Sequence, residues 1–401
     1  MGLCAAHLQE EKIMEKRFLS KRYSSEEESV MGKLPAMCAG LDDLINLSLG
    51  DPDILTSQKI IEKTFSDVME GHTKYTDCRG YRELRDEIAG YYKEEFNMKV
   101  ADEEIMVTSS ACMAMYLALE AILDDGDEVI VPAPYFTIYK TQVELARGRL
   151  VELDTFEEEG YQVDAARLEA LITPRTKAII LNSPNNPTGS CLRLDTMEKI
   201  AELAEKHDLV VISDEIYTIY SFAAPFVPFA SLPRMKERTI TLNSFSKNFV
   251  MTGWRIGAML AAPQIINVAR KINENLIYSA PSVSQRAALH ALRCRREIQP
   301  GLVESFKERV YYAAERINRI PNMHVLYPPM GSFYLFINIK ATGLSSEEAA
   351  KKICEEAHVL TIPGNGFGDC GEGYLRIACT VDISLLKEAF DRIEKMKIFQ
   401  N

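Results

Sequence analysis

The chain has 401 residues, of which 47% are hydrophobic and 26% charged, and its formal net charge is −12 at pH 7. This composition is typical of a folded protein with a large core, and the length indicates two or possibly three domains. The acidic balance argues against nucleic acid as a partner, although it permits a local basic pocket for a small anion. No apolar run approaches the roughly 20 residues of a membrane span, so we predict no membrane partner.

Cysteine and histidine usage bears on redox state and metal binding. The nine cysteines form no Cys-x-x-Cys pair, which indicates reduced thiols in a cytosolic setting rather than a disulfide framework. The six histidines show no metal-ligand spacing, so we predict no metal site. The stretch Met1–Ala6 is too short for the core of a signal peptide and is followed by charge. We therefore expect a cytoplasmic protein.

The first organised element of the sequence begins near Ile45. The residues before it are mostly charged, and we expect them to form an arm or short helices packed against another part of the protein. A short strand then ends at Gly50 in a turn, where glycine permits close approach of the backbone to a ligand.

From Ile105 onward, predicted strands and helices alternate. A helix is predicted over 112–123, and Asp195 is predicted to cap another helix that ends near His207. Several predicted strands are continuously apolar, as expected of strands covered on both faces; the six segments are 105–108, 128–131, 149–153, 177–181, 209–213 and 239–242. The alternation predicts an α/β fold with a large, doubly wound and mainly parallel sheet.

After Pro300 the pattern changes to that of a smaller α+β domain. An amphipathic helix over 302–317 is followed by Gly331–Phe336, a helix capped by Ser345, and further strands and a last helix, with strand segments at 359–363 and 374–378. We therefore divide the chain into an N-terminal arm with part of the small domain (1–48), a large ligand-binding domain (49–299) and a small C-terminal domain (300–401).

The stretch 241–257 combines an apolar strand with an unusual set of polar groups. Two hydroxyls, Ser244 and Ser246, and the guanidinium of Arg255 are groups that hold a phosphate dianion. Lys247 lies among them, and its amine is suited to Schiff-base chemistry. A phosphate site around one lysine suggests pyridoxal phosphate. Taken alone, the stretch also fits a basic surface turn.

Other polar groups follow predicted strands in the same way. Ser110, Ala111 and Cys112 open a helix, whose free backbone N–H groups suit phosphate binding. Asn186 and Asp214 follow two further strands, although a turn and a helix cap would explain them individually. Ligands of an open parallel sheet bind beyond the carboxyl ends of its strands, so we expect these groups to share one crevice.

These motifs, in this order, resemble the class I/II aminotransferases, the aspartate aminotransferase superfamily of pyridoxal-phosphate fold type I. The resemblance runs from about residue 46 to 392, and the block around Lys247 is its most specific part. Its elements are Lys74-Tyr-Thr-Asp77 with Gly80 and Glu83-Leu-Arg85, then Asn-Asn-Pro-Thr-Gly189, Asp-Glu-Ile-Tyr217, Ser-Phe-Ser-Lys247, Thr-Gly-Trp-Arg-Ile-Gly257, Gly331-Ser-Phe-Tyr334 and Gly373-Tyr-Leu-Arg376.

The resemblance implies a role for each matching residue. Lys247 is expected to form the imine with pyridoxal phosphate and to shuttle the proton, and Asp214 is expected to pair with the pyridine nitrogen. Tyr217 and Asn186 are expected to hydrogen-bond the phenolic oxygen of the ring. The phosphate is assigned to Ser244, Ser246, Arg255 and the backbone of Ser110, Ala111 and Cys112. Ring stacking is assigned to Phe136, and binding of the substrate α-carboxylate to Arg376, Gly50 and Asn186.

Tyr75 matches a residue that reaches the phosphate of the other subunit, so the resemblance implies a homodimer with shared active sites. One position departs from the pattern: Ser110 stands where many relatives have glycine. We expect its side chain to be tolerated if the backbone there is helical.

The predicted activity is a pyridoxal-phosphate-dependent aminotransferase that works by a ping-pong mechanism between an L-amino acid and a 2-oxo acid. A C–S β-lyase on the same fold is the first alternative, because the same lysine, aspartate and arginine would serve it. A non-catalytic ligand-binding regulator is the second. The Thr-Gly-Trp-Arg-Ile-Gly block resembles transaminases more than lyases and favours the first activity.

The substrate side chain is predicted from the absence of a second cation. An enzyme for dicarboxylates needs one, because a buried unpaired charge is costly. In part of the family a lysine supplies it, and Cys112 aligns with that lysine here. The neighbouring Met113, Tyr116, Tyr135 and Phe136 are apolar or aromatic. We therefore expect neutral or aromatic amino acids to be favoured over aspartate, unless Arg17 or Arg22 enters the pocket.

Overall fold

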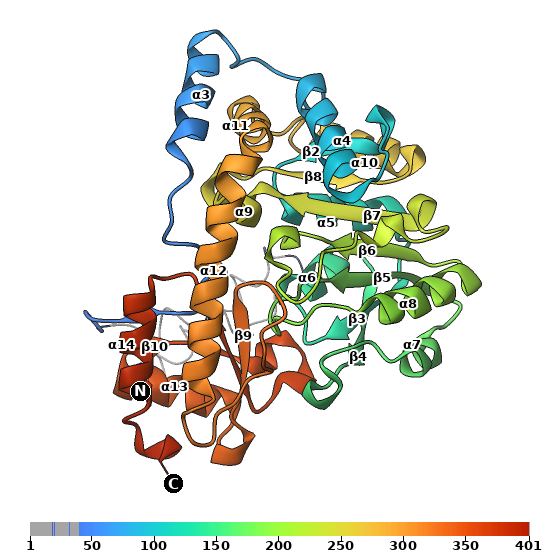
Figure 1. Ribbon diagram of the computed structural model, residues 1–401. Helices are drawn as coiled ribbons and strands as arrows, with labels where there is room; N and C mark the ends of the chain where they lie inside the picture. Colours follow the sequence, from blue (N-terminus) through green and yellow to red (C-terminus); the bar gives the residue numbers. More distant parts are fainter. Residues whose placement is uncertain (1–17, 19, 21–31, 33–39, 401) are drawn as a thin grey trace, which may run out of the picture.

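The computed structural model describes residues 18, 20, 32 and 40–400, and its larger part is a seven-stranded sheet covered by helices (Figure 1). The strands, in their order across the sheet, are β2 (Ile105–Thr108), β8 (Gly257–Leu260), β7 (Thr239–Ser244), β6 (Val210–Asp214), β5 (Thr176–Asn182), β3 (Glu128–Ala133) and β4 (Arg149–Asp154). The mainly parallel α/β sheet is confirmed, and each predicted strand is present with ends that differ by at most two residues.

Strand β8 is the element of this sheet that sequence reasoning missed. It pairs antiparallel with both β2 and β7, whereas the β7–β6, β6–β5, β5–β3 and β3–β4 pairs are parallel. The strand has four residues and follows β7 after the four-residue helix α9 and a polar loop, so no long helix separates the two strands. An antiparallel return of this kind needs only a loop, and the expected alternation of strands and helices does not reveal it.

Both faces of the sheet are buried, because successive residues of the inner strands enter two different cores. In β5, Ile180 packs into a core with α5 and α6, and Ile179 packs into a core with α7 and α8. Helices α4 and α11 cover β2 and β8. The helices of this part are α3 (Gln58–Met69), α4 (Arg82–Phe96), α5 (Ala111–Ile122), α6 (Ile138–Leu145), α7 (Ala165–Leu171), α8 (Leu194–Lys206), α9 (Phe245–Asn248), α10 (Pro263–Leu276) and α11 (Ser282–Arg293).

The predicted cap of α8 is wrong. Arg193 occupies the N-cap position, and Asp195 lies inside the first turn of the helix. Its carboxylate contacts the exposed Arg193 guanidinium at 3.3 Å. An acidic residue in the first turn still interacts favourably with the helix dipole, so its presence predicted the helix but misplaced its beginning.

The remaining elements form a smaller layer against the long helix α12 (Arg295–Ile317). Its strands are β9 (Tyr334–Asn338), β12 (Tyr374–Ala378) and β11 (Ile362–Pro363), which form an antiparallel sheet, and the parallel pair β1 (Ile45–Asn46) and β10 (Val359–Leu360). Helices α13 (Ser346–Ala357) and α14 (Ile383–Ile393) complete it.

The cap predicted at Ser345 for α13 is confirmed, and it is part of a capping box with Glu348. The Ser345 hydroxyl accepts the Glu348 backbone N–H at 3.3 Å, and the Glu348 carboxylate accepts the Ser345 backbone N–H at 3.0 Å. Helix α12 begins seven residues before the predicted start and includes Pro300. The division at residue 300 stays a prediction, and the N-terminal arm lies almost wholly outside the described residues.

Candidate active site

One edge of the large sheet gathers the predicted site residues. Parallel strands β3, β5, β6 and β7 end there, and so does β2, because β8 is antiparallel to both β2 and β7. The amino end of β8 therefore lies at the same edge, which explains why Arg255 precedes a strand while the other groups follow one. The groups at this edge are Ser110–Cys112, Phe136, Asn186, Asp214, Tyr217, Ser244, Ser246, Lys247 and Arg255.

Lys247 lies in the short helix α9, which begins directly after β7. The helix starts at Ser244, whose hydroxyl accepts the backbone N–H of Ser246 at 3.1 Å. The half-buried Lys247 amine donates to the backbone carbonyl of Gly50 at 2.5 Å and lies 5.8 Å from the centre of the Phe333 ring. The structure thus brings together two residues that are 197 positions apart in the sequence.

Asp214, the last residue of β6, is a buried carboxylate that accepts a hydrogen bond from the protein at one of its two oxygens. Its Oδ2 accepts the hydroxyl of Tyr139 at 2.5 Å, while its buried Oδ1 has no hydrogen-bond partner. Burial raises the pKa of Asp214 from the usual 3.8 to about 6, and the Tyr139 bond lowers it in part. A buried acceptor without a partner is costly, and it marks a place where a donor would be stabilised.

Arg376, on β12 of the small sheet, is a buried cation with neutral partners. It donates to Asn186 Oδ1 at 3.2 Å and to the backbone carbonyl of Ser48, and its buried Nε has no partner. Its guanidinium lies 4.7 Å from the ring centre of Tyr334 and 5.1 Å from that of Phe367. Burial lowers the pKa of Arg376, although a guanidinium stays charged in proteins.

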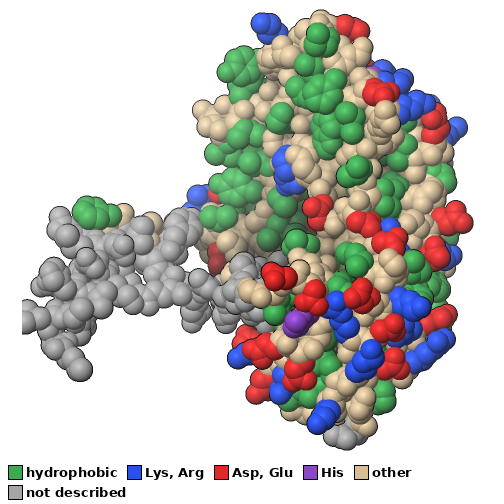
Figure 2. Space-filling view, turned by 90° about the vertical axis from the view of Figure 1, so that its left-hand side faces the viewer, with side chains coloured by type: hydrophobic (Ala, Val, Ile, Leu, Met, Phe, Trp, Pro, Cys, Tyr) green, Lys and Arg blue, Asp and Glu red, His purple; other side chains and the backbone are tan. Residues whose placement is uncertain are grey.

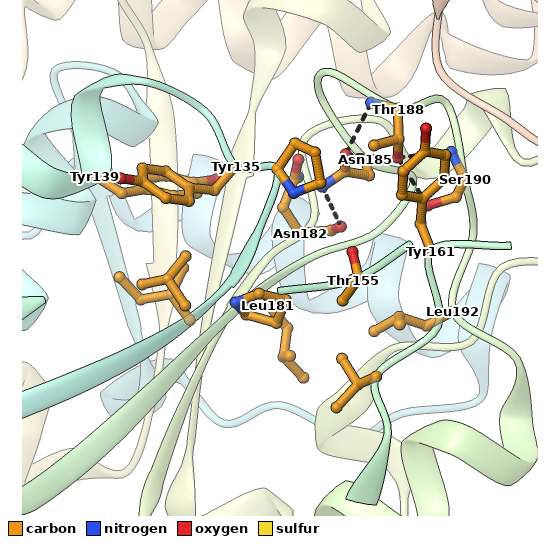
Figure 3. A pocket seen from close by; sticks show the side chains of 15 residues that line it. Tyr135, Tyr139, Thr155, Tyr161, Leu181, Asn182, Asn185, Thr188, Ser190 and Leu192 are labelled. Carbon is orange, nitrogen blue, oxygen red and sulfur yellow. Dashed lines mark hydrogen bonds between the residues drawn. The ribbon is translucent and has the colours of Figure 1, made fainter. Parts of the chain in front are cut away.

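Asn186 and Tyr217 lie between the aspartate and the arginine. The backbone N–H of Asn186 donates to Asn182 Oδ1 at 2.9 Å, within a turn that borders the cavity drawn in Figure 3. The Tyr217 hydroxyl contacts the Tyr334 hydroxyl at 3.3 Å, and burial raises its pKa well above the usual value. Both side chains are buried, so their polar atoms are held in defined places.

The predicted phosphate groups converge around the start of β8. A Cβ added to Gly257 would lie 2.8 Å from the backbone nitrogen of Ala111, so the beginning of α5 approaches the beginning of β8 closely. Arg255 is exposed and donates to the Thr252 carbonyl at 2.8 Å. Ser244 and Ser246 are buried beside Lys247 on α9. The amino end of a helix, two hydroxyls and a guanidinium together suit an anion.

The condition stated for Ser110, a helical backbone, is not met. Ser110 is the N-cap of α5 and has φ 85° and ψ 161°, in a region that favours glycine. The turn therefore keeps the backbone shape that glycine would allow, with a serine side chain in its place. Its buried position shows that the surrounding structure maintains this conformation.

Two predicted aromatic residues occupy different surroundings. Phe136 packs edge-to-face against Tyr139 at 5.7 Å and so lies beside the tyrosine that bonds Asp214. Tyr75 is 89% exposed, and its aromatic contact within the described chain is Tyr278, at 5.3 Å, rather than a group of the crevice. The structure does not bring Tyr75 to the site of its own chain.

Sequence reasoning gave no role to several residues that contact the predicted set. Tyr139 bonds Asp214, and Tyr334 contacts both Tyr217 and Arg376. Tyr139 follows Phe136 by three residues, but that spacing does not indicate that Tyr139 bonds Asp214. Tyr334 belongs to the Gly-Ser-Phe-Tyr element, which is a weak motif on its own.

Two general findings concern the described part of the chain. It contains no helix long and apolar enough to cross a membrane. It also contains no group of three or more histidine, cysteine or acidic side chains placed to hold a metal ion.

Comparison with known proteins matches residues 42–393 to the family described as aminotransferase class I and II. The aspartate aminotransferase of Pyrococcus abyssi is 39% identical over 382 residues, which cover 94% of this chain and 98% of that protein. The aromatic-amino-acid aminotransferase 2 of Thermococcus litoralis is 37% identical over 385 residues, which cover 94% and 98%. The solved structure of a single mutant of Thermus thermophilus aspartate aminotransferase matches with a TM-score of 0.89 and 32% identity, covering 94% of this chain and 99% of that one.

The predicted family and fold are confirmed, and each relative named here is an aminotransferase. This favours transamination over the lyase and the regulator that the sequence alone left open. The chain therefore belongs to the class I and II aminotransferases, within the pyridoxal-phosphate-dependent aspartate aminotransferase family.

Proposed function

We propose that this chain transfers an amino group between an L-amino acid and a 2-oxo acid by a ping-pong mechanism, with pyridoxal phosphate held at the edge of the large sheet. The observation that carries the proposal is the buried Asp214 with its unpartnered Oδ1, in the same crevice as Lys247 and Arg376. Each of these three groups lacks the ionic partner that a purely structural role would provide among the described residues.

The residues present fit this cofactor. A protonated pyridine nitrogen would donate to Asp214 Oδ1 and remove the cost of the unpartnered buried acceptor. Ser244, Ser246, Arg255 and the amino end of α5 would hold the phosphate, and Lys247 would bind the cofactor covalently. When bound, pyridoxal phosphate supplies an electron sink for the carbanion that forms at the substrate Cα.

The chain's own groups would then bind the substrate and move its proton. Arg376 would take the α-carboxylate, exchanging its neutral acceptors for a charged one, and Asn186 lies at 3.2 Å to orient the guanidinium. The Lys247 amine would remove the proton from Cα and return it to the cofactor side. The Gly50 carbonyl, which accepts from this amine, would hold it at the mouth of the crevice.

Reduction of the purified protein with borohydride tests the cofactor assignment. Peptide mapping by mass spectrometry should place the reduced pyridoxyl group on Lys247, and Lys247→Ala should carry no adduct while still binding the cofactor through its phosphate. Lys236→Ala, which removes a lysine paired with Glu104 away from the crevice, is the matched control and should keep the adduct. An adduct on another lysine, or none, would overturn the proposal.

We further propose that neutral or aromatic amino acids are favoured over aspartate. Cys112 lies at the beginning of α5, and desolvation of its sulfur, followed by the Asp214 carboxylate, raises the pKa of the thiol. It is therefore uncharged at neutral pH and supplies no cation for a distal carboxylate. Arg17 and Arg22, the candidate alternatives, lie outside the described residues. The relatives include both aspartate and aromatic enzymes, so the family does not decide the substrate.

Comparing kcat/KM for aspartate, alanine, methionine, phenylalanine and tyrosine tests this preference. Neutral or aromatic substrates should lead, and Cys112→Lys should raise kcat/KM for aspartate by about tenfold or more because it adds a cation. Cys112→Ala is the matched control and should leave the ranking unchanged. Aspartate ahead of every neutral substrate by about tenfold, or about 1.4 kcal/mol, would refute the preference.

A homodimer is proposed from the exposed apolar surface that includes Tyr75. Figure 2 shows hydrophobic side chains gathered on the upper part of the face on which α3 lies. Large exposed apolar side chains of α3 and its flanking segments are Leu55, Phe65, Met69 and Tyr75, and Tyr278 packs against Tyr75. Contiguous exposed apolar surface is typical of an interface, and a second copy of this chain is the proposed partner.

A further inference from the structure

Tyr334, the first residue of β9, contacts four segments of the proposed site. It is 3% exposed, and none of the family-based assignments above gives it a function. Its neighbours come from the turn at Gly50, the loop that ends at Gly189, the segment after β6 at Tyr217, and β12 at Arg376. These segments are far apart in the sequence, so Tyr334 is a point at which the large and small sheets meet.

The tyrosine ring provides a surface for the substrate-binding arginine. The Arg376 guanidinium lies 4.7 Å from the centre of the Tyr334 ring, and Phe367 lies 5.1 Å away. The hydrogen-bond acceptors of Arg376, Asn186 and the Ser48 carbonyl, are neutral. A desolvated cation gains most from an aromatic face when no carboxylate pairs with it, so the ring holds Arg376 in place before a substrate arrives.

The Tyr334 hydroxyl occupies space that glycine leaves open. A Cβ added to Gly50 would lie 1.8 Å from the Tyr334 Oη and 2.9 Å from its Cζ, whereas the backbone of Gly50 is not left-handed. The glycine is therefore required by this contact and not by its backbone angles. Since the same residue's carbonyl accepts from Lys247, the hydroxyl position and the lysine position depend on each other.

The hydroxyl also meets the hydroxyl of Tyr217 at 3.3 Å. Tyr217 is the donor of this bond and Tyr334 is the acceptor, so the Tyr334 oxygen fixes the direction in which the Tyr217 hydroxyl points.

From these contacts we infer that Tyr334 is a positioning residue for transamination, whose ring orients Arg376 and whose hydroxyl sets the Gly50 turn and Tyr217. The inference rests on the proposed function, because it assigns Arg376 to the substrate carboxylate. It goes beyond that function by predicting that ring and hydroxyl act separately.

The ring is tested by binding of an unreactive carboxylate to the cofactor-loaded enzyme. The probe is 3-phenylpropionate, or succinate if aspartate leads the substrate comparison, and binding is read from the visible absorption of the cofactor. Tyr334→Leu should raise Kd by about tenfold, whereas Tyr334→Phe, which keeps the ring, should change it by less than about twofold. Tyr374→Leu is the matched control, because Tyr374 stacks on Phe336 in the same sheet without contacting Arg376.

The hydroxyl is tested by combining Gly50→Ala with Tyr334→Phe. Gly50→Ala alone should lower kcat/KM by about tenfold or more. In the Tyr334→Phe background the same change should cost several-fold less, because the 1.8 Å contact to the hydroxyl is removed while the 2.9 Å contact to Cζ remains. Should Gly50→Ala be insoluble, recovery of soluble protein in the double variant supports the inference. Insolubility of both variants counts against the hydroxyl contact.

Equal weakening by Tyr334→Leu and Tyr374→Leu, or additive effects of the Gly50 and Tyr334 changes, would overturn the inference. Failure of the proposed function looks different, since borohydride would then leave Lys247 unmodified in the unaltered protein.

Discussion

At the end of β6 the chain buries the Asp214 carboxylate with one oxygen bonded to Tyr139 and the other without a partner. Across the crevice it buries the Arg376 guanidinium against neutral acceptors and two rings. Among the described residues these two groups form no ion pair, and each keeps one buried polar atom without a hydrogen-bond partner. Selection for folding stability alone would favour an ion pair between the two groups, or apolar residues in their place.

The pH dependence of stability should reveal the cost of burying Asp214. Its folded pKa, about 6, is above the usual 3.8, so the folded state holds this proton more tightly. The stability it contributes is fully present below about pH 4 and is lost as the pH rises through about 6. In cofactor-free protein, the free energy of unfolding of Asp214→Asn minus that of wild type should increase across this window by on the order of 3 kcal/mol.

Urea unfolding of both proteins at several pH values measures this difference, and the subtraction removes the titration of groups that the substitution leaves unchanged. A difference that stays flat between pH 4 and pH 7 would contradict the assigned burial of the carboxylate.

Asp214 and Arg376 should also differ kinetically. Asp214→Ala should lower kcat by about a hundredfold or more, because the carboxylate acts on charge that develops during reaction. Arg376→Ala should chiefly raise KM, by on the order of a hundredfold, because its partner carboxylate is present throughout. Steady-state kinetics of the two variants separates these effects. An unchanged kcat in Asp214→Ala would remove its role as partner of the pyridine nitrogen.

Among the elements, strands with continuous apolar sequence were predicted well, because burial on both faces leaves a pattern that needs no partner to recognise. Strand β8 was missed because it returns antiparallel beside β7 after a short segment, outside the alternation of strands and long helices. The starts of α13 and α8 also show how far residue type alone predicts structure. Ser345 makes the reciprocal bonds of a capping box, and Asp195, with equally suitable chemistry, does not cap α8. Residue type indicates that a helix is near, but the loop before it decides where it begins.

These two helix starts form a matched pair for a stability test. Ser345→Ala removes an acceptor of a helix N–H and should lower the free energy of unfolding by about 1 kcal/mol. Asp195→Ala removes an exposed contact to Arg193 and should change it by less than about 0.5 kcal/mol. Chemical denaturation of both variants at pH 7 measures the difference. Equal losses would mean that the capping box is not a source of stability for α13.

For the whole molecule, the sequence motifs predicted which groups meet at the edge of the large sheet, because each motif follows a strand whose direction the fold determines. Contacts between the two sheets were not predictable in this way. The bond from Lys247 to the Gly50 carbonyl and the packing of Tyr334 on Arg376 depend on how the small sheet is placed. The spacing of residues in the sequence does not indicate where the small sheet lies relative to the large one.

The proposed dimer predicts complementation between inactive subunits. Tyr75 is exposed on its own chain, so a Tyr75→Ala variant should lose activity by affecting the partner's site, while Lys247→Ala should lose its own. A hybrid dimer would contain one intact site, and mixing the two variants under subunit exchange should recover up to about a quarter of wild-type activity for random pairing. Each variant incubated alone is the control. No recovery from an impaired Tyr75→Ala variant would count against sites shared between subunits.

The pairing of β1 with β10 has a consequence for the synthesis of the protein. Chains are made from the amino terminus and domains fold as they emerge, so the large sheet, with Asp214 and Lys247, can be complete before the partner of β1 exists. Arg376 is added 129 residues after Lys247. On the ribosome, the groups proposed to hold the cofactor are therefore made before the one arginine proposed to pair with the carboxylate of the amino acid.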